Sequence, residues 1–268
     1  MDAAVLGLGE AGGRIAADLV AAGCGVRGWD PVARPEGVPV ASDGPSAVLG
    51  AEIVLSVNAA AVALEVAKDV AGSVGSDAIY ADCNTSSPAL KHELAASVPG
   101  RFADVALVGT VPTLGLRTPA LASGAGAERF AELVRPLGMP VEVVGAEPGD
   151  AAGLKLLRSV FMKGLAAAAI ESTEAARAAG AEEWVCADIA SVIGAPLLER
   201  LLAGSRTHAA RRVDEMNAAV AFLDELGVSP RVAVAASEWL RQLRDEAPSA
   251  WRRQSATTTR SSTCTTTS

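Results

Sequence analysis

The sequence predicts an α/β domain with a mostly parallel, doubly wound sheet, followed by an all-α domain that is entered through a long interdomain helix. Three observations lead to this prediction. Short apolar runs alternate with helical patterns up to about residue 145, strand signals stop after Gly149, and a helical pattern without proline covers residues 150 to 179. Strands that alternate with helices form parallel sheets with helices on both faces.

The strands of this sheet are expected at seven short apolar runs. In chain order they are AAVLG, CGVRGW, EIVLSV, DAIYAD, FADVALV, ALAS and VEVV. Amphipathic or alanine-rich segments between several of them have the length and pattern of helices, which is typical of repeated strand–helix–strand units.

The second half of the chain shows only helical patterns. After the long helix they lie near residues 182–193, 196–203, 206–226 and 231–245. Glycine followed closely by proline, at Gly194 and Pro196 and again at Gly227 and Pro230, is typical of one helix that ends and another that begins.

Composition restricts the function. The chain has 268 residues, 50% of them hydrophobic, and a net charge of −8, so a nucleic-acid partner is not expected. No apolar run reaches the length of a membrane span. The four cysteines lack the spacing of a metal or redox motif, and the first strand leaves no room for a signal peptide, so we expect no metal and a cytoplasmic location.

Gly7, Gly9 and Gly12 form G-x-G-x-x-G between the first strand and a helix, which is the dinucleotide-binding fingerprint of the Rossmann fold. Gly7 would permit the tight turn, Gly9 the approach of a diphosphate to the backbone, and Gly12 the contact of helix with strand. The helix N-terminus would attract the phosphates. Leu8, Glu10 and Ala11 complete the expected cofactor loop, with the Glu10 side chain directed away.

Asp30 ends the second strand, 18 residues after Gly12, where a carboxylate accepts hydrogen bonds from the adenosine ribose. This acid favours NAD because it repels a 2′-phosphate, whereas Arg34 could hold such a phosphate, so NADP stays open. Val57 and Asn58 follow the third strand and are expected on the cofactor side of the sheet.

Four segments occur in the order typical of one enzyme family. They are the opening loop, Asp82 to Pro88 (DCNTSSP), Asp104 to Thr110 (DVALVGT) and Gly153 to Leu157 (GLKLL). Over residues 3 to 245 the chain resembles the β-hydroxyacid dehydrogenases, which are relatives of 6-phosphogluconate dehydrogenase and of the imine reductases. THAARRVDEM, residues 207 to 216, indicates a less characterised branch.

The resemblance implies a Rossmann domain at 1–148, a helical substrate and dimerisation domain at 149–250, and a homodimer. Beyond Gln254 the residues are almost all Ser and Thr, so we expect a disordered tail at 251–268. The resemblance also implies roles for individual residues. These are Lys155 as the catalytic lysine, Asn84 as a cofactor residue, and Thr85, Ser86, Val108, Gly109 and Thr110 as substrate residues.

The chain departs from the family after the lysine. Asparagine is usual three or four residues later, where this sequence has Arg158 and Ser159, which we include among the candidate substrate residues. Lysines are rare here, with 4 among 23 basic residues, and lysine can shuttle a proton that arginine retains. Lys155 therefore stands out on composition as well.

These observations predict an NAD(P)-dependent dehydrogenase that acts on a small hydroxy acid or a related alcohol or carbonyl compound, with Lys155 as general acid and base. The substrate is expected to be polar or acidic. An imine reductase is one alternative, although those enzymes generally carry another residue in place of Lys155. A non-catalytic dinucleotide sensor is the other.

Overall fold

The computed structural model describes residues 1–246 and contains two compact units, Met1–Leu157 and a second that begins at Arg158. The predicted tail at 251–268 lies outside the described residues. Each unit is described by itself below.

The first unit contains one seven-stranded sheet in the order β2-β1-β3-β4-β5-β6-β7. All neighbouring strands are parallel except β5 and β6. The strands are β1 (Asp2–Leu6), β2 (Gly25–Trp29), β3 (Ile53–Ser56), β4 (Ile79–Asp82), β5 (Arg101–Leu107), β6 (Ala120–Ser123) and β7 (Val141–Gly145). The mostly parallel α/β sheet predicted from the sequence is confirmed, with a strand at each of the seven apolar runs.

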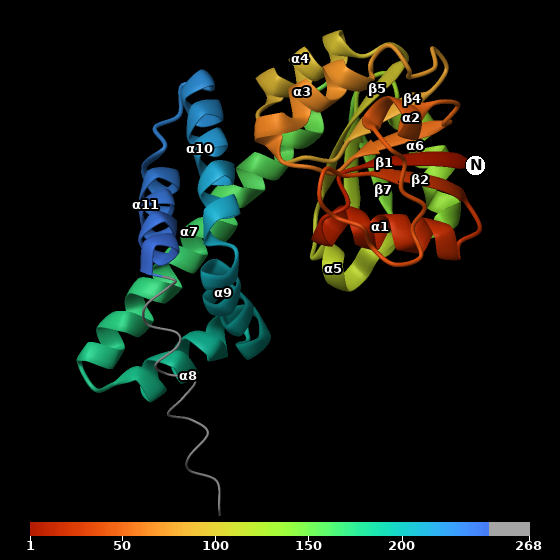
Figure 1. Cartoon of the computed structure of the whole chain (residues 1–268). Helices are drawn as coiled ribbons and strands as arrows, with labels where there is room; N and C mark the ends of the chain where they lie inside the picture. The colour runs from red at the N-terminus through yellow and green to blue at the C-terminus, as the bar shows by residue number, and fades with distance from the viewer. Residues whose placement is uncertain (247–268) are drawn as a thin grey trace, which may run out of the picture. The chain divides into compact units, whose positions relative to one another are not determined.

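Helices cover both faces of this sheet (Figure 1). They are α1 (Glu10–Ala21), α2 (Gly44–Val48), α3 (Ala60–Val70), α4 (Pro88–Ser97), α5 (Val111–Leu114) and α6 (Ala127–Val134), with short 3-10 turns at η1 (Gly115–Arg117) and η2 (Arg135–Leu137). Residues of the strands alternate between two apolar cores, one on each face of the sheet. Helices α1 and α6 pack on one face, and α2, α3 and α4 pack on the other. Burial on both faces explains why the strands are almost continuously apolar.

The strand order reverses at β1, which lies between β2 and β3. In open parallel sheets, ligands bind at the carboxyl ends of the strands next to such a reversal. The glycine loop after β1 and the segment after β3 therefore flank the expected binding position.

Helix α7 (Asp150–Ala178) begins in the first unit and continues into the second. The other helices of the second unit are α8 (Glu182–Ile193), α9 (Ala195–Thr207), α10 (Ala209–Glu225) and α11 (Arg231–Glu246). Ile170, Ala209 and Leu243 form part of their apolar core. The all-helical second half predicted from the sequence is confirmed. The largest differences are at α9, which extends to Thr207, and at α10, which begins at Ala209.

Candidate functional site

The glycine loop has the shape that a diphosphate requires. Gly7 has φ +96°, and a Cβ there would lie 2.4 Å from the Val57 carbonyl oxygen. A Cβ on Gly12 would lie 1.9 Å from the Gly7 carbonyl oxygen, so the helix meets the strand only because this side chain is missing. A Cβ on Gly9, in contrast, would meet no protein atom within 4 Å. No protein atom therefore fills the space next to the Gly9 Cα atom.

Helix α1 begins at this open position. Its N-cap is Gly9, and no side chain caps the helix. The first helix amides have no partner within the helix, and Gly13 N is the first to donate to a backbone carbonyl, that of Gly9, at 2.8 Å. Open space in front of amides that have no partner within the helix, together with the helix dipole, suits an anionic group. The loop therefore fits a dinucleotide diphosphate.

Asp30 fixes the glycine loop to the end of β2. Its Oδ2 accepts a hydrogen bond from Leu8 N at 2.8 Å, and its Oδ1 accepts from Val32 N and Ala33 N, each at 2.8 Å. Burial by itself raises the pKa of Asp30, but these three amides and the Arg34 charge outweigh it, so the pKa lies below its usual value. The carboxylate is held ionised, and Oδ2 keeps capacity for a second donor.

Arg34 folds back onto the same turn. Its Nη1 donates to the carbonyl oxygens of Asp30, at 2.6 Å, and Ala33, at 2.8 Å, while the side chain is exposed. Glu10 is also exposed, at the first position of α1. Arg34 therefore lies beside the expected ribose position with its guanidinium on backbone carbonyls.

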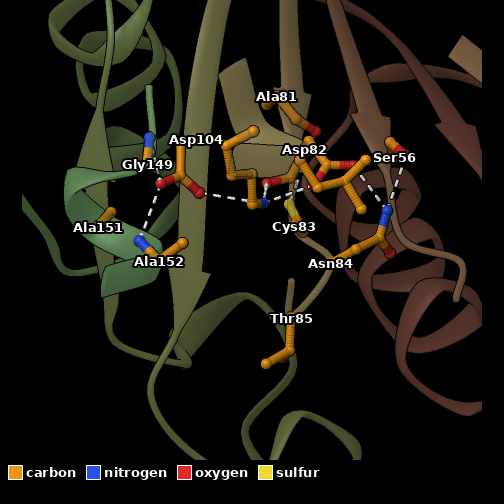
Figure 2. Close-up of polar contacts among 12 residues, drawn as sticks. Ser56, Ala81, Asp82, Cys83, Asn84, Thr85, Asp104, Gly149, Ala151 and Ala152 are labelled. Carbon is orange, nitrogen blue, oxygen red and sulfur yellow. Dashed lines mark hydrogen bonds and ion pairs between the residues drawn. The ribbon is translucent and has the colours of Figure 1, made fainter. Parts of the chain in front are cut away.

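The ends of β3 and β4 meet in a side-chain network (Figure 2). Asn84 Nδ2 donates to Ser56 Oγ at 3.1 Å, to Asn58 Oδ1 at 3.0 Å and to Asp82 Oδ2 at 2.6 Å. Asn84 Oδ1 and Ser86 Oγ are buried and accept no hydrogen bond among the described residues. Buried polar atoms without a partner are rare, and they mark a place where a ligand can complete the network.

Lys155 lies in the second turn of α7 and is half-buried. Its Nζ donates to Thr85 Oγ1 at 2.7 Å, across 70 residues of sequence. Thr85 follows Asn84 directly, so the structure brings the predicted catalytic lysine to the predicted cofactor and substrate loop. The Cys83 thiol is next to this loop. Burial and then Asp82 raise its pKa to about 12, so it stays protonated.

Val108, Gly109 and Thr110 follow β5, and Gly109 and Thr110 are exposed. Val108 N donates to the Pro119 carbonyl at 2.7 Å, and Thr110 is the N-cap of the short helix α5.

Arg158 and Ser159 lie in the second unit, beyond the division of the chain. Arg158 is exposed. Ser159 is buried, and its Oγ donates to Glu215 Oε1, which also accepts from Lys163 Nζ at 2.7 Å. Burial lowers the pKa of Lys163, and Glu215 opposes this shift. These contacts join α7 to α10 within the second unit.

Sequence reasoning missed Lys91. This lysine lies on α4, its side chain is fully buried, and it forms ion pairs with Asp82 and Asp104. A signal was present: Lys91 shares the buried stripe of α4 with Leu94, and two neighbouring strands carry the acids. Among residues 1–246 there is no cluster of His, Cys, Asp or Glu suited to a metal, and no helix able to cross a membrane.

Comparison with known proteins identifies relatives. Residues 176–243 match the model of the Domain of unknown function DUF1932. The chain is 30% identical over 189 residues to an uncharacterized 28.5 kDa protein in the 7S RNA 5′ region of Methanothermus fervidus, which covers 69% of this chain and 73% of that protein.

Two solved structures connect the chain to hydroxyacid dehydrogenases. One is a conserved protein of unknown function described as structurally similar to 3-hydroxyacid dehydrogenases (30% identity, TM-score 0.69, 92% of this chain and 99% of that chain). The other is Mycobacterium tuberculosis 3-hydroxyisobutyrate dehydrogenase with L-serine (20% identity, TM-score 0.77, 92% and 94%), a likeness of fold. The chain belongs to the family of 3-hydroxyacid dehydrogenase-like proteins, in the group whose helical region matches DUF1932.

Proposed function

We propose that this chain is an NAD(P)-dependent dehydrogenase that moves a hydride between nicotinamide and the carbinol carbon of a small hydroxy acid or related alcohol. The observation that carries the proposal is the contact of Lys155 Nζ with Thr85 Oγ1, at 2.7 Å, in the same unit as the open glycine loop. Family membership supports an oxidoreductase in general terms. The polar or acidic substrate and the homodimer are proposed with it.

The cofactor is proposed to lie with its diphosphate on Gly9 and the start of α1 and its ribose on Asp30. A bound nicotinamide supplies the hydride acceptor or donor. NAD is favoured over NADP because the Asp30 carboxylate is held ionised at the ribose position. Asn84 and Asn58, with Val57 beside the glycine turn, are proposed to contact the nicotinamide half.

Lys155 is proposed to move the proton. During oxidation the substrate hydroxyl gives its proton to Nζ of the neutral lysine while the hydrogen on the carbinol carbon leaves as hydride. During reduction the ammonium returns that proton to the carbonyl oxygen. Thr85 accepts a hydrogen bond from the same Nζ and so directs it. Ser86 and the segment Val108–Thr110 are proposed to hold the polar part of the substrate.

The test replaces Lys155 with methionine, which has a similar length and no proton to transfer. We expect kcat to fall by about 10²–10⁴-fold while the Kd for NADH changes little. Lys68→Met is the matched control, since Lys68 is exposed on α3. The measurement uses hydroxy acids, ketones and cyclic imines in one panel with NAD⁺, NADH, NADP⁺ and NADPH.

The outcomes separate the candidate functions. Lys155→Met with the turnover of the wild-type chain would end the assignment of Lys155. Turnover only on cyclic imines would favour an imine reductase. Binding of NADH without turnover of any compound would favour a dinucleotide sensor.

A further inference from the structure

Lys91 has no part in the chemistry proposed above, yet its side chain is fully buried. Its Nζ donates to the Asp82 carbonyl oxygen at 2.9 Å and to Asp82 Oδ1 at 2.5 Å, and it lies 3.0 Å from Asp104 Oδ1. Asp82 therefore accepts two hydrogen bonds from the ammonium, and Asp104 is its ion-pair partner. The buried lysine is therefore paired with two carboxylates.

The carboxylates belong to a row of polar residues that crosses the sheet. The strand register pairs Ser56 with Asp82, Asp82 with Asp104, and Asp104 with Ser123, and all four side chains are fully buried. Neighbouring carboxylates repel each other, and burial makes their charges costly. One ammonium, inserted from α4, offsets one of the two negative charges.

One end of the row holds the loop that follows β4. Asp82 Oδ2 accepts from Asn84 Nδ2 at 2.6 Å (Figure 2). The next residue is Thr85, whose Oγ1 accepts a hydrogen bond from Lys155. The loop position therefore depends on the Asp82 carboxylate.

The other end of the row holds the start of α7. Asp104 Oδ2 accepts from Gly149 N at 3.1 Å and from Ala152 N at 2.8 Å (Figure 2). Ser123 Oγ accepts from Ala151 N at 3.1 Å. A carboxylate at a helix N-terminus satisfies amides that have no partner within the helix. Lys155 lies on this helix, four residues after Ala151.

We propose that Lys91 is a positioning residue for Lys155. It links Asp82, which holds the loop with Thr85, to Asp104, which holds the helix with Lys155. Without this link the loop after β4 and the start of α7 can shift relative to each other. The inference rests on the proposed role of Lys155, and it assigns to Lys91 no contact with substrate or cofactor.

The test compares Lys91→Met plus Asp82→Asn with Asp82→Asn alone. The double variant removes the ammonium and one carboxylate together, so the row keeps its net charge of one negative and Asp104 still caps α7. In Asp82→Asn alone, Lys91 still pairs with Asp104. The two variants differ only at residue 91, so any difference in their behaviour reports the effect of the Lys91 side chain. Leu94→Ala, on the buried face of the same helix, is the control for destabilisation without a polar change.

Two readouts are needed. Hydrogen exchange of a peptide covering residues 149–156 reports the start of α7 without any substrate, and we expect it to be about tenfold faster in the double variant than in Asp82→Asn. The kcat on the most active compound of the panel is expected to fall by about 10²-fold, since a displacement of about 1 Å has that effect, with an unchanged Kd for NADH. Leu94→Ala should lower the melting temperature and leave kcat per folded protein unchanged.

Equal exchange in the double variant and Asp82→Asn, or a kcat that does not differ between them, would overturn the positioning role and leave the proposed function standing. If the wild-type chain turned over no compound of the panel, the proposed function would be wrong, and Lys91 would have no positioning role in catalysis. If the double variant does not fold, Lys91→Gln in the Asp82→Asn background is judged by the same two readouts.

Discussion

Lys155 and Thr85 are 70 residues apart in the sequence, and Lys155 Nζ donates a hydrogen bond to Thr85 Oγ1 at 2.7 Å. The contact joins the second turn of α7 to the loop after β4. It brings a titratable amine to a hydroxyl that can direct it, next to Asn84 and on the same unit as the glycine loop. A lysine placed in this way can serve as general acid and base.

Replacement of Thr85 tests this contact. We expect Thr85→Val to lower kcat by about tenfold, because it removes a hydrogen bond to a charged donor and keeps the side-chain shape. Thr85→Ser keeps the hydroxyl and should retain most of the activity. Steady-state kinetics of both variants provide the measurement, and equal kcat values for Val and Ser would contradict the prediction.

Substitution of Gly9 tests whether the space in front of it is used by a ligand rather than by packing of the protein. Gly9→Ala should leave the melting temperature unchanged, since the added Cβ meets no protein atom within 4 Å. It should weaken NADH binding by about tenfold, because the Cβ enters the space proposed for the diphosphate. Fluorescence titration with NADH gives the Kd. Gly72→Ala, also without a neighbour within 4 Å, is the control.

Gly12→Ala, unlike Gly9→Ala, should lower the unfolding free energy of the protein. Its Cβ would lie 1.9 Å from the Gly7 carbonyl oxygen, so α1 must move away from β1. We expect a loss of about 1–3 kcal/mol in unfolding free energy, measured by urea denaturation. Native stability of Gly12→Ala would show that the close approach of helix and strand is not required.

Asp30 is expected to set the cofactor preference. Asp30→Asn removes the negative charge that the proposed ribose contact uses, so we expect NADH affinity to fall by about tenfold and the NADH to NADPH affinity ratio to decrease. Glu36→Gln, an exposed change on the same loop, should leave the ratio unchanged. Tighter binding of NADPH than NADH by the wild-type chain would contradict the preference.

Asp30 also predicts a pH effect on stability. Its folded-state pKa lies below the unfolded value of about 3.9, so its ionised form stabilises the fold above that pH. This contribution is lost as the pH falls through the folded-state pKa. The difference in unfolding free energy between the wild-type chain and Asp30→Asn should therefore shrink between pH 7 and pH 3. A pH-independent difference for Asp30→Asn would refute the idea.

Local patterns were enough to predict the elements of the fold. The seven strands and the long helix follow from apolar runs and helical periodicity, which neighbouring residues determine. Gly7 and Gly12 were predictable because their backbone constraints belong to one turn. The catalytic role of Lys155 was predicted from the resemblance to a family and stays a prediction, to which the structure adds the contact with Thr85.

What the sequence by itself determined is the order of strands and helices, the glycine turn and the family of the chain, because each depends on short-range spacing. Only the tertiary structure decided that Lys91 lies between Asp82 and Asp104. That arrangement requires the register of two neighbouring strands and the placement of α4 above them. Such a contact between distant segments exists only after the sheet has formed, and buried charges then become partners that no local pattern specifies.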